Sequence, residues 1–172
     1  MPFAPFNELF PEIAEKETRS LTIIDDSELP AGNYGLIEMY CNEPDCDCRR
    51  VFFSVLSSKA QRIVAVIAYG WESADFYARW MGDDDPQVIM DLKGPVLNLG
   101  SPQSKWAPAI LKIVQNVVLQ DTHYVERLKV HYKIFRAVID HKGNTKGTRS
   151  QRKSRIKRLT RSRKRPLTRG SD

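Results

Sequence analysis

The sequence predicts an α+β fold, in which a small antiparallel sheet of three or four strands packs with C-terminal helices ahead of a disordered basic tail. Apolar segments between residues 35 and 69 have strand-like composition, and the segments after residue 104 carry apolar residues at helical spacing. Charge is also uneven: residues 1–141 hold 14 Lys and Arg against 20 Asp and Glu, whereas residues 142–172 hold 13 against one. We therefore expect a single α+β domain with a cysteine-rich hairpin over residues 1–141 and a basic tail over 142–172.

The first elements are expected to be short. Residues 10–17 predict a helix, because Pro11 suits a first-turn position and acidic residues follow at the positive end of the helix dipole. Residues 21–24 are apolar enough for a short strand, and Pro and Gly within residues 30–33 predict a turn.

Three longer segments form the expected sheet. In residues 35–41, Leu36, Glu38 and Tyr40 would face one side of a strand and Ile37, Met39 and Cys41 the other. Residues 49–57 carry apolar residues on both faces. Residues 62–69 are apolar throughout, which predicts a central strand. The connection at residues 57–61 is short enough to join the last two strands as an antiparallel hairpin, and residues 96–99 are a further short strand candidate.

The second half of the domain is expected to be helical. Ser73 is a plausible N-cap for a helix over residues 74–80, and residues 104–119 carry an apolar stripe at helical spacing. Asp121 is the expected N-cap of a last helix that runs to about Asp140. On that helix the basic residues Lys129, Lys133 and Arg136 are expected on outward faces.

A cysteine cluster is the feature of the domain that points to chemistry. Cys41, Cys46 and Cys48 have the spacing C-x4-C-x-C and lie between two expected strands. An odd number of cysteines without a secretion signal favours reduced thiols over a disulfide framework. Zinc prefers four thiolate, imidazole or carboxylate ligands in a tetrahedron, and a turn can present closely spaced thiols. The cluster therefore predicts a zinc site that lacks one ligand.

The fourth ligand has several candidates. His131 lies near the apolar face of the last helix, so we take it as the fourth zinc ligand. The alternative for His131 is a core histidine hydrogen-bonded to the backbone. The other candidates are a water molecule or the side chains of His123, His141, Asp45 and Asp47. A water ligand would make an open, catalytic type of site, and a protein ligand a closed, structural one.

Two other interpretations of the cysteines remain open. The three thiols could be reduced cysteines in a buried hairpin, with no ligand. A redox or nucleophilic role would need a lowered thiol pKa. The neighbouring Arg49 and Arg50 favour this, whereas Glu43, Asp45 and Asp47 oppose it.

The run over residues 40–51 reads Y-C-x4-C-D-C-R-R-V and resembles the core of a group of bacterial proteins with no assigned function. The runs D-L-K-G-P at 91–95 and Y-V-E-R-L at 124–128, with H-Y at 131–132, are similar to parts of the same group. The resemblance covers about residues 10–140 and implies no activity. The Cys-Asp-Cys also looks like half of the SEC-C zinc motif, whose second ligand pair is missing here.

The basic tail predicts a polyanionic partner. Dense Lys and Arg attract phosphates without reading sequence, and the tail has no aromatic residue on which bases could stack. RNA or DNA is the expected partner, although an anionic membrane surface or the acidic domain itself would also attract the tail. The expected nucleic-acid-binding residues are Arg152, Lys153, Arg155, Lys157, Arg158, Arg161, Arg163, Lys164 and Arg165.

These observations predict a non-enzymatic zinc-binding module with a tail that binds nucleic acid nonspecifically. No apolar run approaches the roughly 20 residues of a membrane helix, and residues 1–5 do not begin a signal peptide, so we expect a cytoplasmic protein. One alternative is a metalloenzyme with an open three-cysteine site. Another is a small protein-interaction domain with an aromatic patch near Trp71 or Trp80. The run Asp83–Asp85 is expected to be a solvated turn.

Overall fold

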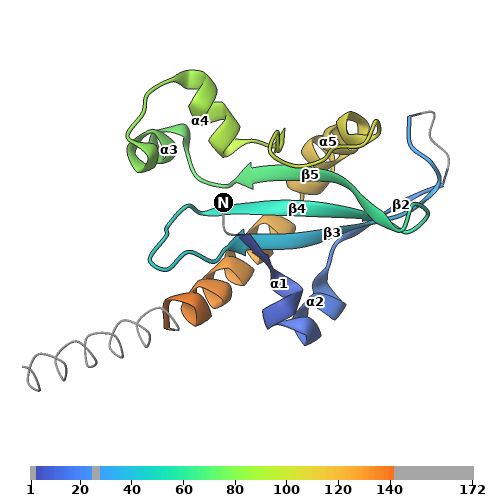
Figure 1. Ribbon diagram of the computed structural model, residues 1–172, viewed down its shortest axis with the longest axis horizontal. Helices are drawn as coiled ribbons and strands as arrows, with labels where there is room; N and C mark the ends of the chain where they lie inside the picture. Colours follow the sequence, from blue (N-terminus) through green and yellow to red (C-terminus); the bar gives the residue numbers. More distant parts are fainter. Residues whose placement is uncertain (1–2, 25–27, 142–172) are drawn as a thin grey trace, which may run out of the picture.

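The computed structural model describes residues 3–24 and 28–141, so the expected disorder of residues 142–172 lies outside the described residues. Helices surround an antiparallel sheet (Figure 1). The strands are β1 (Phe3–Pro5), β2 (Ser20–Ile23), β3 (Gly32–Cys41), β4 (Arg50–Ser57), β5 (Arg62–Gly70) and β6 (Val96–Leu97). The helices are α1 (Phe6–Leu9), α2 (Pro11–Glu17), α3 (Ala74–Met81), α4 (Pro86–Lys93), α5 (Ala107–Asn116), the 3-10 helix η1 (Val118–Gln120) and a C-terminal helix over residues 122–141.

The mixed α+β class is confirmed, but the expected three or four strands are a six-stranded sheet. The strand order is β1-β3-β4-β5-β6, and β2 pairs with the same edge of β3 that β1 uses further along. The extra pairings involve strands as short as the two residues of β6. Strands of that length cannot show the alternation by which sequence patterns reveal a strand.

Residues 62–69 form β5, which lies inside the sheet as expected, although β4 is the middle strand and only the two-residue β6 pairs with the outer edge of β5. The apolar character of β5 has another cause. Both α4 and α5 pack against β5 and help to bury it, although no long strand lies on its outer edge. An apolar run reports burial of a strand, and helices can supply that burial as well as neighbouring strands.

The two expected N-caps are confirmed. The Ser73 hydroxyl accepts a hydrogen bond from the Phe76 N–H at 3.2 Å, and Asp121 Oδ1 accepts from the His123 N–H at 3.1 Å. Other boundaries differ. The expected helix over residues 10–17 is α2, with Pro11 at its first position and the short α1 before it. The expected helix over residues 104–119 ends earlier and continues as η1.

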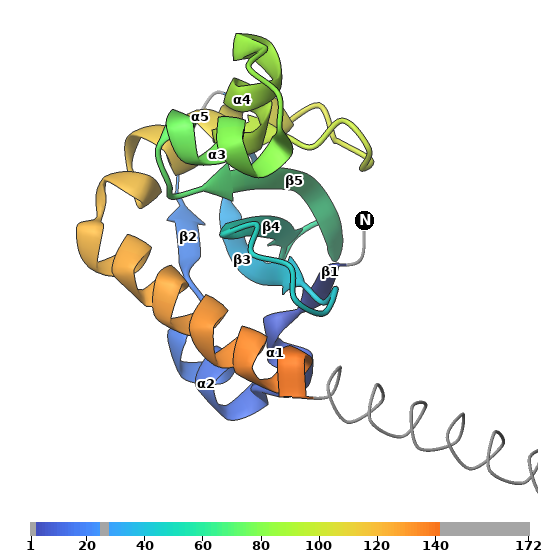
Figure 2. The ribbon, with the colours of Figure 1, turned by 90° about the vertical axis from the view of Figure 1, so that its left-hand side faces the viewer.

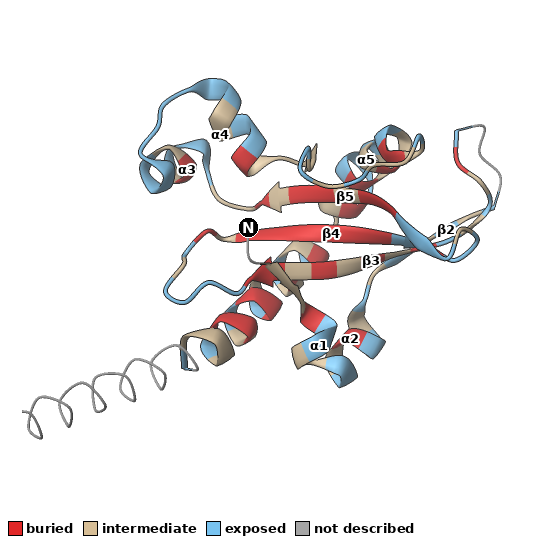
Figure 3. Ribbon diagram, in the orientation of Figure 1, coloured by how far each residue is buried: buried red, intermediate tan, exposed pale blue. Residues whose placement is uncertain are grey.

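The C-terminal helix packs across one face of the sheet, with α1 and α2 beside it (Figure 2). Its Tyr124, Leu128 and Phe135 side chains are buried, and the Tyr124 ring stacks on Phe53 of β4 with centroids 6.3 Å apart. Strand β4 is buried along most of its length (Figure 3). In the described part of the chain, no helix has the length and apolar character needed to cross a membrane.

Candidate metal centre

The structure brings the three cysteines together. Their sulfur atoms all lie within 4.8 Å of one another, and we call this group the thiol cluster. Cys41 is the last residue of β3, and Cys48 lies two residues before β4. Cys41 and Cys48 are each 3% exposed, whereas Cys46 is half-buried. The expectation that the C-x4-C-x-C loop could hold a metal ion is confirmed at this level.

The loop between Cys41 and β4 folds back on itself through an unusual backbone. Asp45 and Arg49 have φ values of 60° and 47°, which L-residues adopt at a cost of about 1 kcal/mol each. A turn hydrogen bond joins the Cys46 N–H to the Glu43 carbonyl at 3.3 Å. These turns bring the three sulfurs together. Because the positive φ values cost free energy, other contacts must hold the loop in this shape.

The C-terminal helix supplies the first of these contacts. Arg136 is buried and donates from Nη1 to the carbonyl oxygens of Cys41 at 2.9 Å and Glu43 at 2.8 Å. It also forms an ion pair with Asp140 one turn later, and Asp140 accepts a hydrogen bond from the Asp45 N–H at 3.0 Å. The expectation that Arg136 faces outward is therefore wrong, because its guanidinium satisfies carbonyls that the loop leaves unpaired.

Helix α3 holds the loop from the other side. The Tyr77 hydroxyl is buried and donates to the Arg49 carbonyl at 2.9 Å. The Arg49 guanidinium lies 4.6 Å from the centroid of the Phe76 ring and forms ion pairs with Asp47 and Glu72. The loop is thus held on both sides, and Phe76 and Tyr77 of α3 help to fix the shape of the thiol cluster.

The thiols share their charge unequally. The Cys48 thiol donates to the Cys41 sulfur, and this hydrogen bond is the main reason why the pKa of Cys41 falls to about 6. The same interaction raises the pKa of Cys48, and burial raises the pKa of Cys46. The positive charge of Arg136 also favours the Cys41 thiolate. Cys41 is thus the sulfur of the cluster that loses its proton most readily, and a divalent cation would displace the remaining protons.

The structure does not bring His131 to the thiols. Its Nδ1 lies 2.7 Å from Glu38 Oε2 and its Nε2 lies 3.1 Å from Glu17 Oε2, so carboxylates engage both ring nitrogens. The Tyr40 hydroxyl donates to the same Glu38 oxygen at 2.8 Å. We call these four residues the histidine cluster. The ring of His131 is buried and stacks on Phe6, with centroids 4.4 Å apart.

The other ligand candidates fall into two groups. His123 lies in the first turn of the C-terminal helix, about 25 Å along the helix axis from Asp140. Asp47 has both carboxylate oxygens hydrogen-bonded to Arg49. Asp45 is exposed within the loop, and His141 follows the Asp140 that contacts it. A carboxylate or an imidazole therefore lies near the loop. In the described part of the chain, however, the potential ligand atoms that lie close to one another are the three cysteine sulfurs.

The remaining predicted sites are placed as follows. The nine basic residues between Arg152 and Arg165 lie outside the described residues. In the acidic turn, Asp85 caps α4 by accepting from the Gln87 N–H at 2.8 Å, which is a structural role. Trp71 packs against Tyr132 with centroids 5.2 Å apart, and Trp80 is 40% exposed.

No protein-family model, curated protein or solved structure matches this chain. The chemistry of the thiol cluster therefore has to be argued from its own geometry.

Proposed function

We propose that the protein is a non-enzymatic zinc-binding module whose basic tail binds nucleic acid. The observation that carries the proposal is the meeting of three sulfurs within 4.8 Å in a loop held on both flanks. A reducing, cytoplasmic compartment suits three free cysteines. We also propose that residues 10–140 belong to the bacterial group with the Y-C-x4-C-D-C-R-R core.

Zinc is the metal that best suits this donor set. Soft thiolates select zinc over magnesium or calcium, and zinc has no redox chemistry that would demand further groups. With Zn–S bonds of about 2.3 Å, sulfurs in a tetrahedron lie about 3.8 Å apart. The thiol cluster is close to this spacing already, and the Arg136 cation offsets part of the negative charge of a three-thiolate centre. Asp45, His141 or water completes the tetrahedron.

A structural role is better supported than a catalytic one. Cys41 and Cys48 are each 3% exposed, and the loop backbone is tied to two helices. A catalytic zinc needs an open position in a cavity that substrate can enter. The largest cavity described below, of about 570 Å³, is lined by other residues. A zinc held by these thiols would mainly fix the loop against the C-terminal helix.

The proposed tail function follows from charge and attachment. The last described turn of the C-terminal helix lies against the loop through Asp140 and Asp45. The basic tail, which begins at residue 142, directly follows this helix in the sequence. Zinc that fixes this helix end would fix the point from which the tail reaches a phosphate backbone.

Metal analysis of the purified full chain tests the first half of the proposal. We expect one equivalent of zinc, and cobalt substitution should give a thiolate charge-transfer band and the strong visible bands of tetrahedral Co²⁺. Cys48→Ser should lose metal, while His131→Gln should keep both stoichiometry and spectrum. Less than about half an equivalent of zinc, with Cys48→Ser equally stable to unfolding, contradicts the proposal. Loss of metal in His131→Gln with an unchanged fold would restore His131 as a ligand.

A binding titration tests the second half. Full-length protein should bind single-stranded RNA with an affinity that falls steeply with salt, at a slope of about −0.7 per phosphate contacted. A chain in which the nine basic residues from Arg152 to Arg165 are Gln should lose this binding while keeping its metal. Equal affinity of the two chains, or an affinity that salt does not change, would refute the role of the tail.

A further inference from the structure

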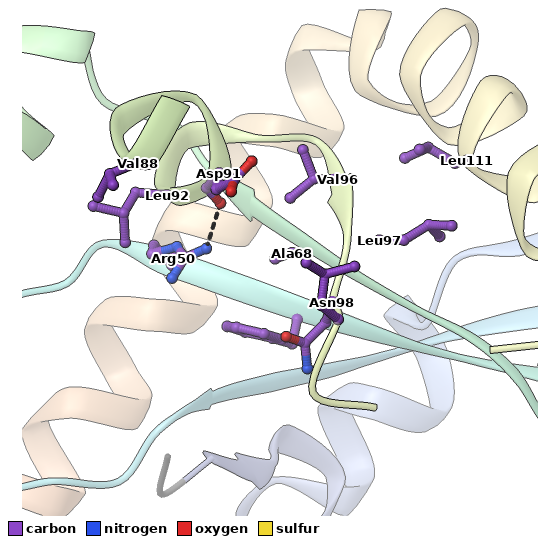
Figure 4. A pocket seen from close by; sticks show the side chains of 11 residues that line it. Arg50, Ala68, Val88, Asp91, Leu92, Val96, Leu97, Asn98 and Leu111 are labelled. Atoms are coloured by element: carbon purple, nitrogen blue, oxygen red, sulfur yellow. Dashed lines mark hydrogen bonds between the residues drawn. The ribbon is translucent and has the colours of Figure 1, made fainter. Parts of the chain in front are cut away.

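A cavity of about 570 Å³ lies where α4 and β6 meet β4 and β5 (Figure 4). Its walls are mainly apolar, and they include Phe52, Leu92, Val96 and Leu97. Its volume falls in the range of small-molecule sites, which combine apolar walls with a few polar groups. None of its lining residues belongs to the thiol cluster or the histidine cluster.

Arg50 is the buried polar group in this wall. Only 5% of the residue is exposed, and its guanidinium lies over the Phe52 ring at 5.2 Å. Its Nη2 donates to the backbone carbonyl of Asp91 at 3.0 Å, whereas its Nε has no hydrogen-bond partner among residues 3–24 and 28–141. A buried guanidinium is normally matched by a carboxylate. Here the charge meets one carbonyl and retains unused donor capacity.

The charges around Arg50 do not fill that role. The carboxylate of Asp91 belongs to an exposed residue and accepts from Gln87 Nε2 at 2.9 Å, so solvent screens it. The Cys48 thiol and the Tyr77 hydroxyl act on Arg50 only through space, without a hydrogen bond to its guanidinium in the described chain. The wall of the cavity thus presents a cation that an anion entering the cavity would neutralise.

The apolar space extends beyond Arg50. A second cavity of about 390 Å³ shares Phe52 and Asn98 with the first and continues over Met39 and Val66. Leu99, at the wall of the first cavity, is 93% exposed. Together the two cavities give an elongated apolar path with a cation near one end.

We propose that this path binds a small carboxylate with an elongated apolar body. The carboxylate pairs with Arg50, and the apolar chain lies along Phe52 toward Met39 and Val66. A carboxylate fits because it is the planar acceptor that a guanidinium binds best. An elongated body fits because the two cavities share a wall. This binding is independent of the metal and of the basic tail.

Calorimetric titration of the purified full chain with decanoate and decanol tests the proposal. The two probes have the same apolar chain and differ in charge. We expect decanoate to bind with 1:1 stoichiometry and a Kd of the order of 10–100 µM. Decanol should bind at least about tenfold more weakly, because it lacks the charge-assisted hydrogen bonds to Arg50. Equal binding of the two probes, or no binding of decanoate at 1 mM, overturns the proposal.

Three variants locate the site. Arg50→Met should remove the preference for decanoate over decanol, and Arg62→Met, at an exposed position of β5 outside the cavity, should keep it. Val66→Trp should weaken decanoate but not hexanoate, because it fills the second cavity. Thermal melting establishes that each variant is folded, and the comparison of probes on the unaltered chain stands if Arg50→Met does not fold. A preference that persists in folded Arg50→Met overturns the assignment.

Discussion

The thiol cluster and the histidine cluster both lie against the C-terminal helix, yet they are built in opposite ways. The thiol cluster gathers three sulfurs from one short stretch of chain. A thiol can stabilise a neighbouring thiolate by a hydrogen bond, but three thiolates would have no S–H left to donate. The histidine cluster joins α2, β3 and the C-terminal helix, and it pairs two carboxylates with an imidazole and a phenol. The first cluster could hold a cation, whereas the second finds its partners within the chain, apart from Glu38 Oε1, which has no hydrogen-bond partner among the described residues.

This difference separates two kinds of stabilisation. The histidine cluster fixes the packing of the helix on the sheet, so its disruption should affect the unfolding free energy whether or not metal is present. The thiol cluster fixes one loop, so its disruption should matter mainly when zinc is bound. Changes to each cluster can therefore be designed to move one property and leave the other.

The largest expected effect is the loss of Glu38. Its side chain is 4% exposed and contacts both His131 Nδ1 and the Tyr40 hydroxyl. Glu38→Leu leaves the buried His131 Nδ1 without its partner and leaves the Tyr40 hydroxyl with only the Leu128 carbonyl at 3.1 Å. We expect a loss of about 3 kcal/mol in unfolding free energy, measured by urea denaturation. Glu17 contacts the other nitrogen of His131, but its side chain is 40% exposed, so Glu17→Leu should cost less than about 1 kcal/mol.

Two results would blur the comparison between the clusters. Equal losses of unfolding free energy in Glu38→Leu and Glu17→Leu would mean that burial does not determine how much each carboxylate contributes to stability. A loss of zinc stoichiometry in folded Glu38→Leu would mean that the two clusters are not separate. We expect the variant to keep its metal.

The second expected effect is on the support of the loop. Arg136→Met removes the two hydrogen bonds to the carbonyls of Cys41 and Glu43 and the ion pair with Asp140. We expect a stability loss of about 2–3 kcal/mol and a zinc affinity lower by about tenfold, because groups that orient metal ligands typically have effects of that size. A competition titration with a chromophoric chelator measures the affinity.

Lys133→Met is the matched control on the same helix, because Lys133 is exposed. It should leave zinc affinity unchanged and shift the unfolding free energy by less than about 0.5 kcal/mol. An equal affinity for zinc in Arg136→Met and Lys133→Met would show that the loop holds its shape without the helix.

The two clusters also differ in how far the sequence could predict them. The three cysteines fall within eight residues, so their spacing alone indicates that the thiols can meet. The helical pattern also places His131 near the core, which is confirmed. The partners of His131 could not be predicted from the sequence, because Glu38 and Glu17 are 93 and 114 residues away in the chain. Ligand sets that are local in sequence are predictable from spacing, and those assembled by packing are not.

Arg136 shows a second limit. The sequence places a cation beside an apolar stripe and predicts exposure, whereas the structure buries it against the carbonyls of the loop. Backbone carbonyls are present at every residue and carry no sequence signal, so a side chain that binds them cannot be recognised from its partner's identity. The same reason hides Arg50, whose guanidinium bonds the Asp91 carbonyl.

A third, smaller effect tests the α3 side of the loop. A Cβ atom added at Gly70 would overlap the Tyr77 hydroxyl, which donates to the Arg49 carbonyl. We expect Gly70→Ala to cost about 2 kcal/mol, because buried Tyr77 must shift. Gly35 lies in the same sheet with nothing within 4 Å of an added Cβ, so Gly35→Ala should be neutral or slightly stabilising. Equal unfolding midpoints for the two variants would mean that α3 can shift to accommodate the added methyl group without a loss of stability.

The smallest expected effect is the pH dependence that separates the histidine cluster from the thiols. Burial lowers the pKa of His131, but the hydrogen bonds and charges of Glu38 and Glu17 outweigh it and raise the pKa above its ordinary value of 6.5. A raised pKa in the folded state means that protonated His131 stabilises the fold. This contribution is fully present below pH 6.5 and is lost as the pH rises through the folded pKa.

The Cys41 thiol titrates in an overlapping range with the opposite sign, since its pKa is lowered to about 6, whereas the pKa values of the other two thiols are raised. Their contribution is common to the unaltered chain and to His131→Gln, so the difference in unfolding free energy between the two isolates the histidine. We expect this difference to be largest near pH 6 and to shrink toward pH 9, as followed by urea denaturation at each pH. A difference that stays constant across this range would mean that neutral imidazole serves the histidine cluster as well as imidazolium does. In that case the cluster would hold the C-terminal helix by shape and hydrogen bonding alone, and its contrast with the thiol cluster would no longer be one of charge.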